Sequence, residues 1–144
     1  MKQRVLFLCT GNSCRSQMAE GLTNTLLGDR FEAYSAGTEP QGLNSLAVRA
    51  MKERGIDISD RDSKHVRDLL HLDLDYVVTV CDHAAETCPV FPGRAVVMHH
   101  GFEDPPKLAE GASTEEEAMA HYRRVRDEIE EFVKTLPETL SNAG

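Results

Sequence analysis

The sequence predicts a single α/β domain in which a four-stranded parallel sheet carries helices on both faces. Short apolar runs typical of buried strands alternate along the chain with segments whose apolar residues recur at helical spacing. The chain has 144 residues, which is close to the commonest domain size, and it contains neither an internal repeat nor a linker. We therefore expect one domain over residues 1–140 and a frayed tail at 141–144.

Five elements are expected in the first half of the chain from the pattern of apolar residues. They are strands at 4–8 and 31–35 and helices at 16–27, 44–54 and 62–70. The first strand is a continuous apolar run, as in strands that are buried on both faces of a parallel sheet. The first two helices end at Gly28 and Gly55, because glycine commonly follows the last helical turn.

The second half of the chain contains the clearest strand and the best-marked helix. Strands are expected at 76–80, which is rich in β-branched residues, and at 95–98, and an acidic surface loop is expected at 107–113. The last helix begins after Thr114, a capping residue with Glu117 three positions on. It ends before Pro137, which cannot continue a helix from inside it.

Charge and composition exclude several classes of function. Lys and Arg total 16 against 24 Asp and Glu, a net charge of −8, which argues against nucleic acid or an anionic membrane as a partner. No apolar run approaches the ~20 residues of a membrane-spanning helix, and the apolar start is too short for a signal peptide. Four cysteines are too few for a disulfide scaffold. We expect a cytoplasmic monomer whose cysteines are either buried core residues or reactive thiols.

The segment between the first strand and the first helix has the composition of an anion-binding loop. Parallel sheets bind ligands at the carboxyl ends of their strands, and a loop leading into a helix there points backbone N–H groups at an anion. Arg15 adds two hydrogen bonds to a tetrahedral oxyanion, and Cys9 in this field is expected to be a nucleophilic thiolate. The alternative is that Cys9 is a core residue before an ordinary turn. The expected cradle comprises Thr10, Gly11, Asn12, Ser13, Cys14, Arg15 and Ser16.

Three cradle residues are expected to differ in role. Asn12 orients the loop by hydrogen bonds to its backbone. Ser16 hydrogen-bonds the Cys9 thiolate or only caps the helix, and the sequence leaves both alternatives open. Cys14 occupies an interior loop position with no separate chemical requirement. No His or Cys spacing typical of a metal site occurs, and the adjacent His99 and His100 are interpreted as surface or packing residues.

Two further cysteines flank a short predicted helix. Cys81 closes the strand at 76–80, so it lies at the same sheet edge as Cys9, and Cys88 follows seven residues later, directly before Pro89. Seven residues of helix span about 10.5 Å, whereas a disulfide needs Cα atoms roughly 4.4–6.8 Å apart. Bonding between them would require the intervening segment to unwind, which favours a redox switch. The alternative is that both are core thiols.

The sequence resembles the low-molecular-weight tyrosine phosphatases and the arsenate reductases that share their fold. The pattern Cys-x5-Arg-Ser that begins at Cys9 is similar to the signature loop of this superfamily. The resemblance covers nearly the whole chain, with similar blocks at 9–21, 34–37, 56–59, 77–81, 88–89, 101–105 and 124–129. The pair of cysteines at 81 and 88 makes the thioredoxin-coupled arsenate reductases the most similar branch.

This resemblance implies a reaction sequence. Cys9 attacks arsenate, Cys81 attacks Cys9 to release arsenite, and Cys88 attacks Cys81 to form a disulfide that thioredoxin reduces. Asp104, which precedes Pro105 in the loop after the fourth strand, would protonate the leaving oxygen. No bound cofactor is implied, and thioredoxin serves as an external reductant.

One position departs from the family pattern. Some of these reductases bind a potassium ion through residues matching Asn12, Glu20 and Ser35, together with an acidic residue where this chain has Lys64. An ammonium group there would take the place of the cation. We therefore expect no potassium requirement.

The sequence thus predicts arsenate reduction to arsenite for arsenic detoxification, and the same cradle leaves room for residual phosphatase activity. Two alternatives stay open. A phosphotyrosine phosphatase would use the extra cysteines to protect Cys9, but only Phe102 supplies an aromatic ring near Asp104. A non-enzymatic oxyanion sensor would bind through the three thiols, but the chain has no basic face or DNA-reading element.

Overall fold

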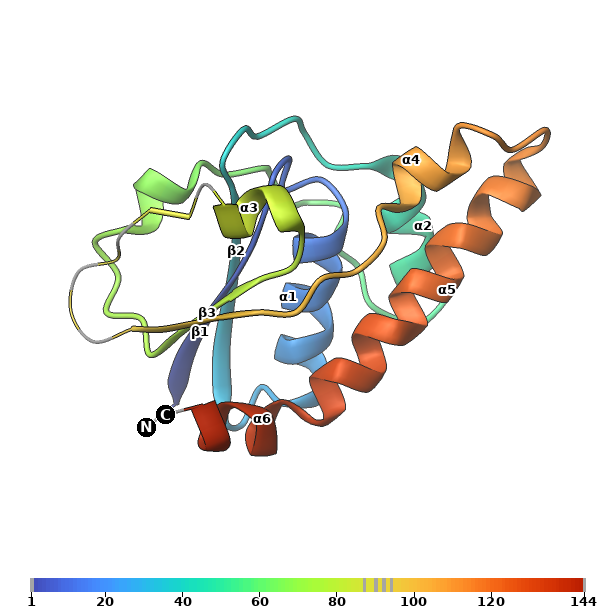
Figure 1. The fold of residues 1–144 in the computed structure, drawn as a ribbon. Helices are drawn as coiled ribbons and strands as arrows, with labels where there is room; N and C mark the ends of the chain where they lie inside the picture. The colour runs from blue at the N-terminus through green and yellow to red at the C-terminus, as the bar shows by residue number, and fades with distance from the viewer. Residues whose placement is uncertain (1, 87, 90, 92, 94, 144) are drawn as a thin grey trace.

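The computed structural model describes residues 2–86, 88–89, 91, 93 and 95–143. The chain forms one parallel α/β domain (Figure 1). The strands are β1 (Gln3–Cys9), β2 (Phe31–Gly37), β3 (Tyr76–Thr79) and β4 (Val96–His99). The helices are α1 (Arg15–Leu26), α2 (Ser45–Lys52), the 3₁₀ helix η1 (Val66–Leu69), α3 (Asp82–Glu86), α4 (Pro105–Ala109), α5 (Glu115–Lys134) and α6 (Leu136–Ala143).

The four strands are all parallel and lie in the order β2-β1-β3-β4. In this register Leu8 of β1 pairs with Ala36 of β2 and with Thr79 of β3. The loops after Cys9, Thr79 and His99 therefore leave the same edge of the sheet. The predicted fold class is confirmed, and so is the common edge of the loops that carry the candidate site residues.

β1 is a central strand, and its sequence explains this position. Its residues Val5, Leu6, Phe7 and Leu8 are all fully buried, as expected for a strand covered on both faces. Figure 1 shows α1, α2 and α5 to the right of the strands, η1 in green to their left, and α6 at the foot of the sheet, opposite the carboxyl ends. None of the helices that the described residues form is both long and apolar enough to cross a membrane.

Side-chain caps define where α2 and α5 begin. Asn44 accepts hydrogen bonds from the backbone N–H groups of Leu46 and Ala47, and its amide also donates to the Tyr122 hydroxyl on α5. Burial raises the pKa of Tyr122 to about 12, so this hydroxyl stays protonated. Thr114 caps α5 as predicted, by accepting from the Glu117 backbone N–H. The Glu117 carboxylate accepts from the N–H of Ser113 rather than of Thr114, so the capping box is displaced by one residue.

The helix predicted over 62–70 is wrong except at its end, where η1 forms. The backbone of this segment is used by the loop after β1: the Lys64 N–H donates to Asn12 Oδ1 at 2.8 Å, and the Gly37 N–H donates to the Lys64 carbonyl at 2.8 Å. Gly37 and His65 also form a parallel bridge. These tertiary hydrogen bonds hold residues 64 and 65 extended, so helical structure begins only after His65.

Two further corrections concern the second half of the chain. The surface loop predicted at 107–113 begins later, because Pro105 opens α4 at the first helical position, where its missing N–H costs nothing. Pro137 does follow the end of α5, but it lies in the first turn of α6. Leu136 and Leu140 are buried by that helix, so residues 141–143 are helical rather than a frayed tail.

We predict that Gly37→Ala lowers the melting temperature and disorders the loop after β1. A Cβ atom on Gly37 would lie 2.5 Å from the Thr10 carbonyl oxygen and 2.9 Å from the Asn12 nitrogen, both backbone atoms that cannot move independently. Overpacking of this kind costs about 1–3 kcal/mol. Gly111→Ala is the matched control, because a Cβ there meets nothing within 4 Å. Equal melting temperatures for the two variants, measured by circular dichroism, would contradict the prediction.

Candidate active site

The loop between β1 and α1 surrounds a cavity of about 360 Å³ at the carboxyl edge of the sheet. Cys9, the last residue of β1, lies in its wall and is 3% exposed. The other lining residues are Thr10, Gly11, Ser13, Cys14, Arg15, Glu39, Gln41, His83, Asp104 and Pro106. The structure therefore brings Cys9, Arg15 and Asp104 together in one cavity, as the sequence predicts.

The Cys9 sulfur is held by two hydrogen-bonding groups. The Asn12 backbone N–H donates to Cys9 Sγ at 3.2 Å, and Ser16 Oγ lies 2.8 Å from the same sulfur. Ser16 Oγ also accepts a hydrogen bond from Asn12 Nδ2 at 2.9 Å. Because the amide occupies an acceptor site on Ser16, the hydroxyl proton is free to point at Cys9. The Ser16 hydroxyl and the Asn12 N–H can therefore both donate to the Cys9 sulfur.

Ser16 is therefore bonded to Cys9 rather than acting as a helix cap. The residue before α1 is Cys14, whose side chain makes no capping hydrogen bond. Burial raises the pKa of the Cys14 thiol well above its usual value, and the neighbouring Cys9 and Asp104 raise it further. Cys14 thus stays a protonated thiol, in agreement with its expected lack of a chemical role.

Asn12 holds the cradle in shape through hydrogen bonds of its side chain and backbone. It is fully buried and adopts φ = +48°, a left-handed conformation that Asn tolerates better than most residues. Its Oδ1 accepts from the Lys64 backbone N–H and from Gln17 Nε2, and its carbonyl accepts from Ser63 Oγ at 2.8 Å. Asn12 and Ser16 are absent from the cavity lining, so they support Cys9 and do not face a ligand.

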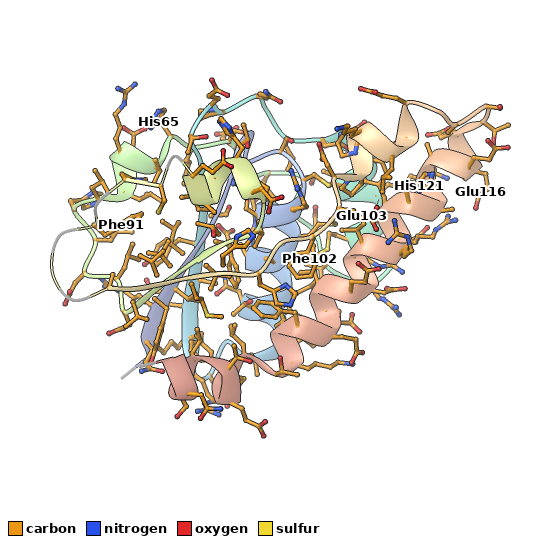
Figure 2. All side chains as sticks on the ribbon, in the orientation of Figure 1. His65, Phe91, Phe102, Glu103, Glu116 and His121 are labelled. Atoms are coloured by element: carbon orange, nitrogen blue, oxygen red, sulfur yellow. The ribbon has the colours of Figure 1, made fainter. Side chains whose placement is uncertain are left out.

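Arg15 joins the cradle to the loop that carries the acid. Its Nη1 donates to the Phe102 carbonyl at 2.9 Å, and its Nη2 lies 3.6 Å from Asp104 Oδ1. Figure 2 shows Phe102 and Glu103 on the segment that runs between α3 and α5 toward α4. Glu103 pairs with Arg124 on α5, which leaves Asp104 as the carboxyl group of this loop that faces the cavity.

The two other candidate cysteines lie on either side of α3. Cys81 is 5% exposed, and its Sγ lies 3.3 Å from Thr10 Oγ1 and accepts from the Ala84 N–H at 3.4 Å. Cys88 is half-buried, and burial raises the pKa of its thiol. All four cysteines are free thiols. Cys81 therefore contacts the cradle directly through Thr10, while Cys88 follows α3 in the sequence.

Sequence reasoning missed four residues of the cavity wall, one of which is Pro106 in α4. Glu39 and Gln41 come from the segment after β2, and His83 comes from α3, where its Nε2 lies 3.9 Å from Glu39 Oε2. Glu39 and Gln41 follow a strand by several irregular residues, a position with no recognisable signal. His83 lies in the segment between the two cysteines, which was the available hint.

The residues that match the family's alkali-ion site are already paired within the protein. Glu20 Oε1 accepts from the Ser35 hydroxyl at 3.0 Å, and the other oxygen of Glu20 is paired with the Arg61 guanidinium. Lys64 Nζ instead donates to the Asp62 carbonyl at 3.1 Å. Arg61, rather than Lys64, therefore supplies the positive charge at Glu20. Within the described ranges, no three His, Cys, Asp or Glu side chains are grouped closely enough to hold a metal ion.

Comparison with known proteins agrees with this geometry. Residues 4–143 match the family described as low molecular weight phosphotyrosine protein phosphatase. The chain belongs to this family. A relative from Halalkalibacterium halodurans, named arsenate reductase, is 54% identical over 138 residues, which cover 96% of this chain and 97% of the relative.

Solved structures of the family superpose on most of the chain. One, described as an arsenate reductase in the phosphate binding state, has a TM-score of 0.78 and 29% identity and covers 99% of both chains. Another, a thioredoxin-dependent arsenate reductase from Corynebacterium glutamicum, has a TM-score of 0.71 and 25% identity and covers 99% of this chain and 63% of its own. This phosphatase family therefore includes proteins named for arsenate reduction.

We predict that Ser16→Ala slows alkylation of Cys9 by iodoacetamide at neutral pH by about tenfold, since a hydrogen bond to a charged group contributes roughly 1.5–3 kcal/mol. Peptide mass spectrometry would follow the modification of Cys9. Ser59→Ala is the control, because the Ser59 hydroxyl is exposed and bonds only Asp57 among the described residues. If Ser16→Ala reacted as fast as the control, the Ser16 hydroxyl would not stabilise the thiolate.

Proposed function

We propose that this protein reduces arsenate to arsenite, with Cys9 as the nucleophile. The observation that carries the proposal is the placement of two thiols at one sheet edge, Cys9 in the wall of the cradle cavity and Cys81 against Thr10, with a third thiol, Cys88, following α3 in the sequence. Thiols cannot readily reduce phosphorus, whereas they can reduce arsenic(V). The name of the relative from Halalkalibacterium halodurans supports this choice of substrate.

In the first step the Cys9 thiolate attacks arsenic. A sulfur–arsenic bond forms and one arsenic–oxygen bond breaks, and the departing oxygen takes a proton from Asp104 and leaves as water. Arg15 is already oriented by the Phe102 carbonyl and lies beside Asp104, so it neutralises the anion while the acid faces the same cavity. The product is a thiol–arsenate adduct on Cys9.

In the second step Cys81, as its thiolate, attacks Cys9 Sγ. The sulfur–arsenic bond breaks with its electron pair left on arsenic, so arsenic(V) becomes arsenic(III) and two thiols become a Cys9–Cys81 disulfide. The contact of Cys81 with Thr10, the neighbour of Cys9, supports direct attack from this side. Arsenite then leaves the cavity.

In the third step Cys88 attacks Cys81, and the Cys9 thiolate is released as a Cys81–Cys88 disulfide forms. This exchange requires α3 to unwind, because Cys81 and Cys88 lie at its opposite ends. We propose thioredoxin as the dithiol that reduces the new disulfide. The description of the Corynebacterium glutamicum enzyme as thioredoxin-dependent supports this partner.

The second candidate function is hydrolysis of a phosphate monoester by Cys9, Arg15 and Asp104 alone. The family to which the chain belongs favours it, since the same cradle serves its phosphatases. Parallel assays with arsenate plus a thioredoxin system and with p-nitrophenyl phosphate separate the two. If the protein hydrolysed the phosphate ester but produced no arsenite, its function would be hydrolysis and not reduction.

Location and assembly stay predictions. A relay of this kind needs a compartment that keeps free thiols reduced, so we propose the cytoplasm. We also expect the protein to act as a monomer, with no nucleic acid or membrane as a partner.

We predict that Cys88→Ser releases arsenite once and then stops. The resolving thiol is missing, so the Cys9–Cys81 disulfide accumulates, and peptide mass spectrometry after one addition of arsenate detects it. Cys9→Ser is the companion variant and releases no arsenite, because the only thiol in contact with Ser16 and the Asn12 N–H is lost. Sustained turnover by Cys88→Ser with thioredoxin would remove Cys88 from the reaction.

We also predict no specific response to potassium. The guanidinium of Arg61 already neutralises Glu20, and a second cation about 4 Å away would be repelled by ~4 kcal/mol at an effective dielectric constant near 20. Potassium and sodium chloride at matched ionic strength should therefore give equal melting temperatures and equal activities. A rise in melting temperature specific to potassium would mean that an alkali ion binds in spite of Arg61.

A further inference from the structure

Three hydrogen-bonded polar side chains lie beside Cys81 and take no part in the proposed reaction. Thr79 Oγ1 on β3 lies 2.8 Å from His99 Nδ1 on β4, and His99 Nε2 lies 3.1 Å from Asp82 Oδ1. Asp82 is the first residue of α3 and directly follows Cys81. These two hydrogen bonds therefore connect the beginning of α3 to the edge of the sheet.

The hydrogen bond between His99 and Asp82 can form in both protonation states of His99. In the neutral ring, Nδ1 accepts from the Thr79 hydroxyl and the Nε2–H donates to Asp82. In the charged ring both nitrogens donate, and the Thr79 hydroxyl turns to the Met98 carbonyl, which lies 3.4 Å away. Thr79 is 1% exposed, so its end of this hydrogen-bonded group is anchored in the core. At the other end, Asp82 is exposed and can separate from His99 without leaving a buried charge.

Gly101 leaves room for this pair. A Cβ atom on Gly101 would lie 3.2 Å from His99 Nε2 and 3.6 Å from Asp82 Oδ1, so the backbone of the segment after β4 packs directly against the hydrogen bond. The neighbouring Phe102 N–H donates to the Val80 carbonyl at 3.1 Å. The surroundings of the His99–Asp82 hydrogen bond are thus formed by β3, the segment after β4, and α3.

α3 depends on such contacts because it is short. A helix of five residues is not stable by itself, since a single turn orders several residues for few hydrogen bonds. Its first turn is held by the Asp82–His99 bond and by the Ala84 N–H, which donates to Cys81 Sγ. The proposed third step requires this turn to open so that Cys88 can reach Cys81.

We propose that His99 and Asp82 form a latch that keeps α3 wound and sets the rate at which Cys88 reaches Cys81. The proposal rests on the relay described under the proposed function. In it, His99 and Asp82 are positioning residues that contact neither arsenate nor a reacting sulfur. Loss of the latch lowers the cost of unwinding α3, while Cys81 keeps its contact with Thr10 and therefore its access to Cys9.

The test compares Asp82→Ala with Asp82→Asn, which retains an oxygen that accepts from the Nε2–H, and with Asp73→Ala at an exposed site elsewhere. After one addition of arsenate, the reaction is quenched at intervals, free thiols are alkylated, and disulfides are identified by mass spectrometry. We expect Asp82→Ala to form the Cys81–Cys88 disulfide roughly two- to fivefold faster, since Asp82 is exposed and such pairs contribute at most about 1 kcal/mol. Both other variants should match the unmodified protein.

Two further measurements separate the latch from the relay. In the Cys88→Ser background, Asp82→Ala should leave the rate of Cys9–Cys81 formation within about twofold, because a single hydrogen bond remote from the reacting sulfurs is lost. Hydrogen exchange of the α3 amides should be faster in Asp82→Ala without any arsenate present. Two outcomes would overturn the latch, provided that the unmodified protein releases arsenite. One is an unchanged rate of Cys81–Cys88 disulfide formation in Asp82→Ala. The other is that Asp82→Ala slows formation of the Cys9–Cys81 and Cys81–Cys88 disulfides equally. If the unmodified protein released no arsenite, the relay itself would be wrong. The hydrogen exchange of the α3 amides would still show whether Asp82 stabilises the helix.

Discussion

The hydrogen bonds of the buried Asn12 side chain hold the cradle in shape, and the site around Cys9 depends on them. Asn12 adopts a left-handed backbone conformation, which by itself is unfavourable for a residue other than glycine. Its side chain bonds Ser16 on one side and the extended backbone at Lys64 on the other. One buried amide thereby sets the direction of the Ser16 hydroxyl, the curve of the loop, and the path of a segment some fifty residues away in sequence.

The parallel sheet converts this local arrangement into a reactive site. Because β1 lies between β2 and β3, the loops that follow them converge on Cys9 without any long excursion of the chain. Close packing at Gly37 brings β2 against the backbone of the cradle, and Arg15 connects the cradle to the segment after β4. Arg15, Asp104 and Cys81 therefore meet Cys9 at the same edge of one sheet.

α3 carries opposing requirements. It is folded in the structure in which Cys81 contacts Thr10, and it must open for Cys88 to meet Cys81 in the proposed relay. A five-residue helix is suited to this because its own hydrogen bonds add little stability. Contacts from neighbouring elements, such as that of His99 with Asp82, then decide which state is populated. A longer helix between the cysteines would be more stable and slower to unwind.

Much of the fold and of the site could be predicted from the sequence, because the relevant information is local. Apolar runs and helical periodicity identified the four strands, α1 and α5, and the spacing of Cys9, Arg15 and Ser16 at a strand–helix junction indicated the cradle. The place of Cys81 followed from the rule that parallel strands end at one edge, whereas Asp104 followed from the resemblance of the segment before Pro105 to the family pattern. The resemblance of the motif at Cys9 to a known superfamily pointed to the family that comparison then established.

What only the tertiary structure decided concerns groups that are distant in sequence. The segment at 62–70 has helical character, but its backbone bonds to Asn12 and Gly37 instead, and no local pattern reveals that competition. In the same way, Arg61 rather than Lys64 meets Glu20, and His99, which lies at the surface as predicted, also meets Asp82. Local propensity, which acts within a few residues, determined most of the strands and the longer helices. The pairing of polar side chains is decided by which elements the fold packs together, and that information exists only in three dimensions.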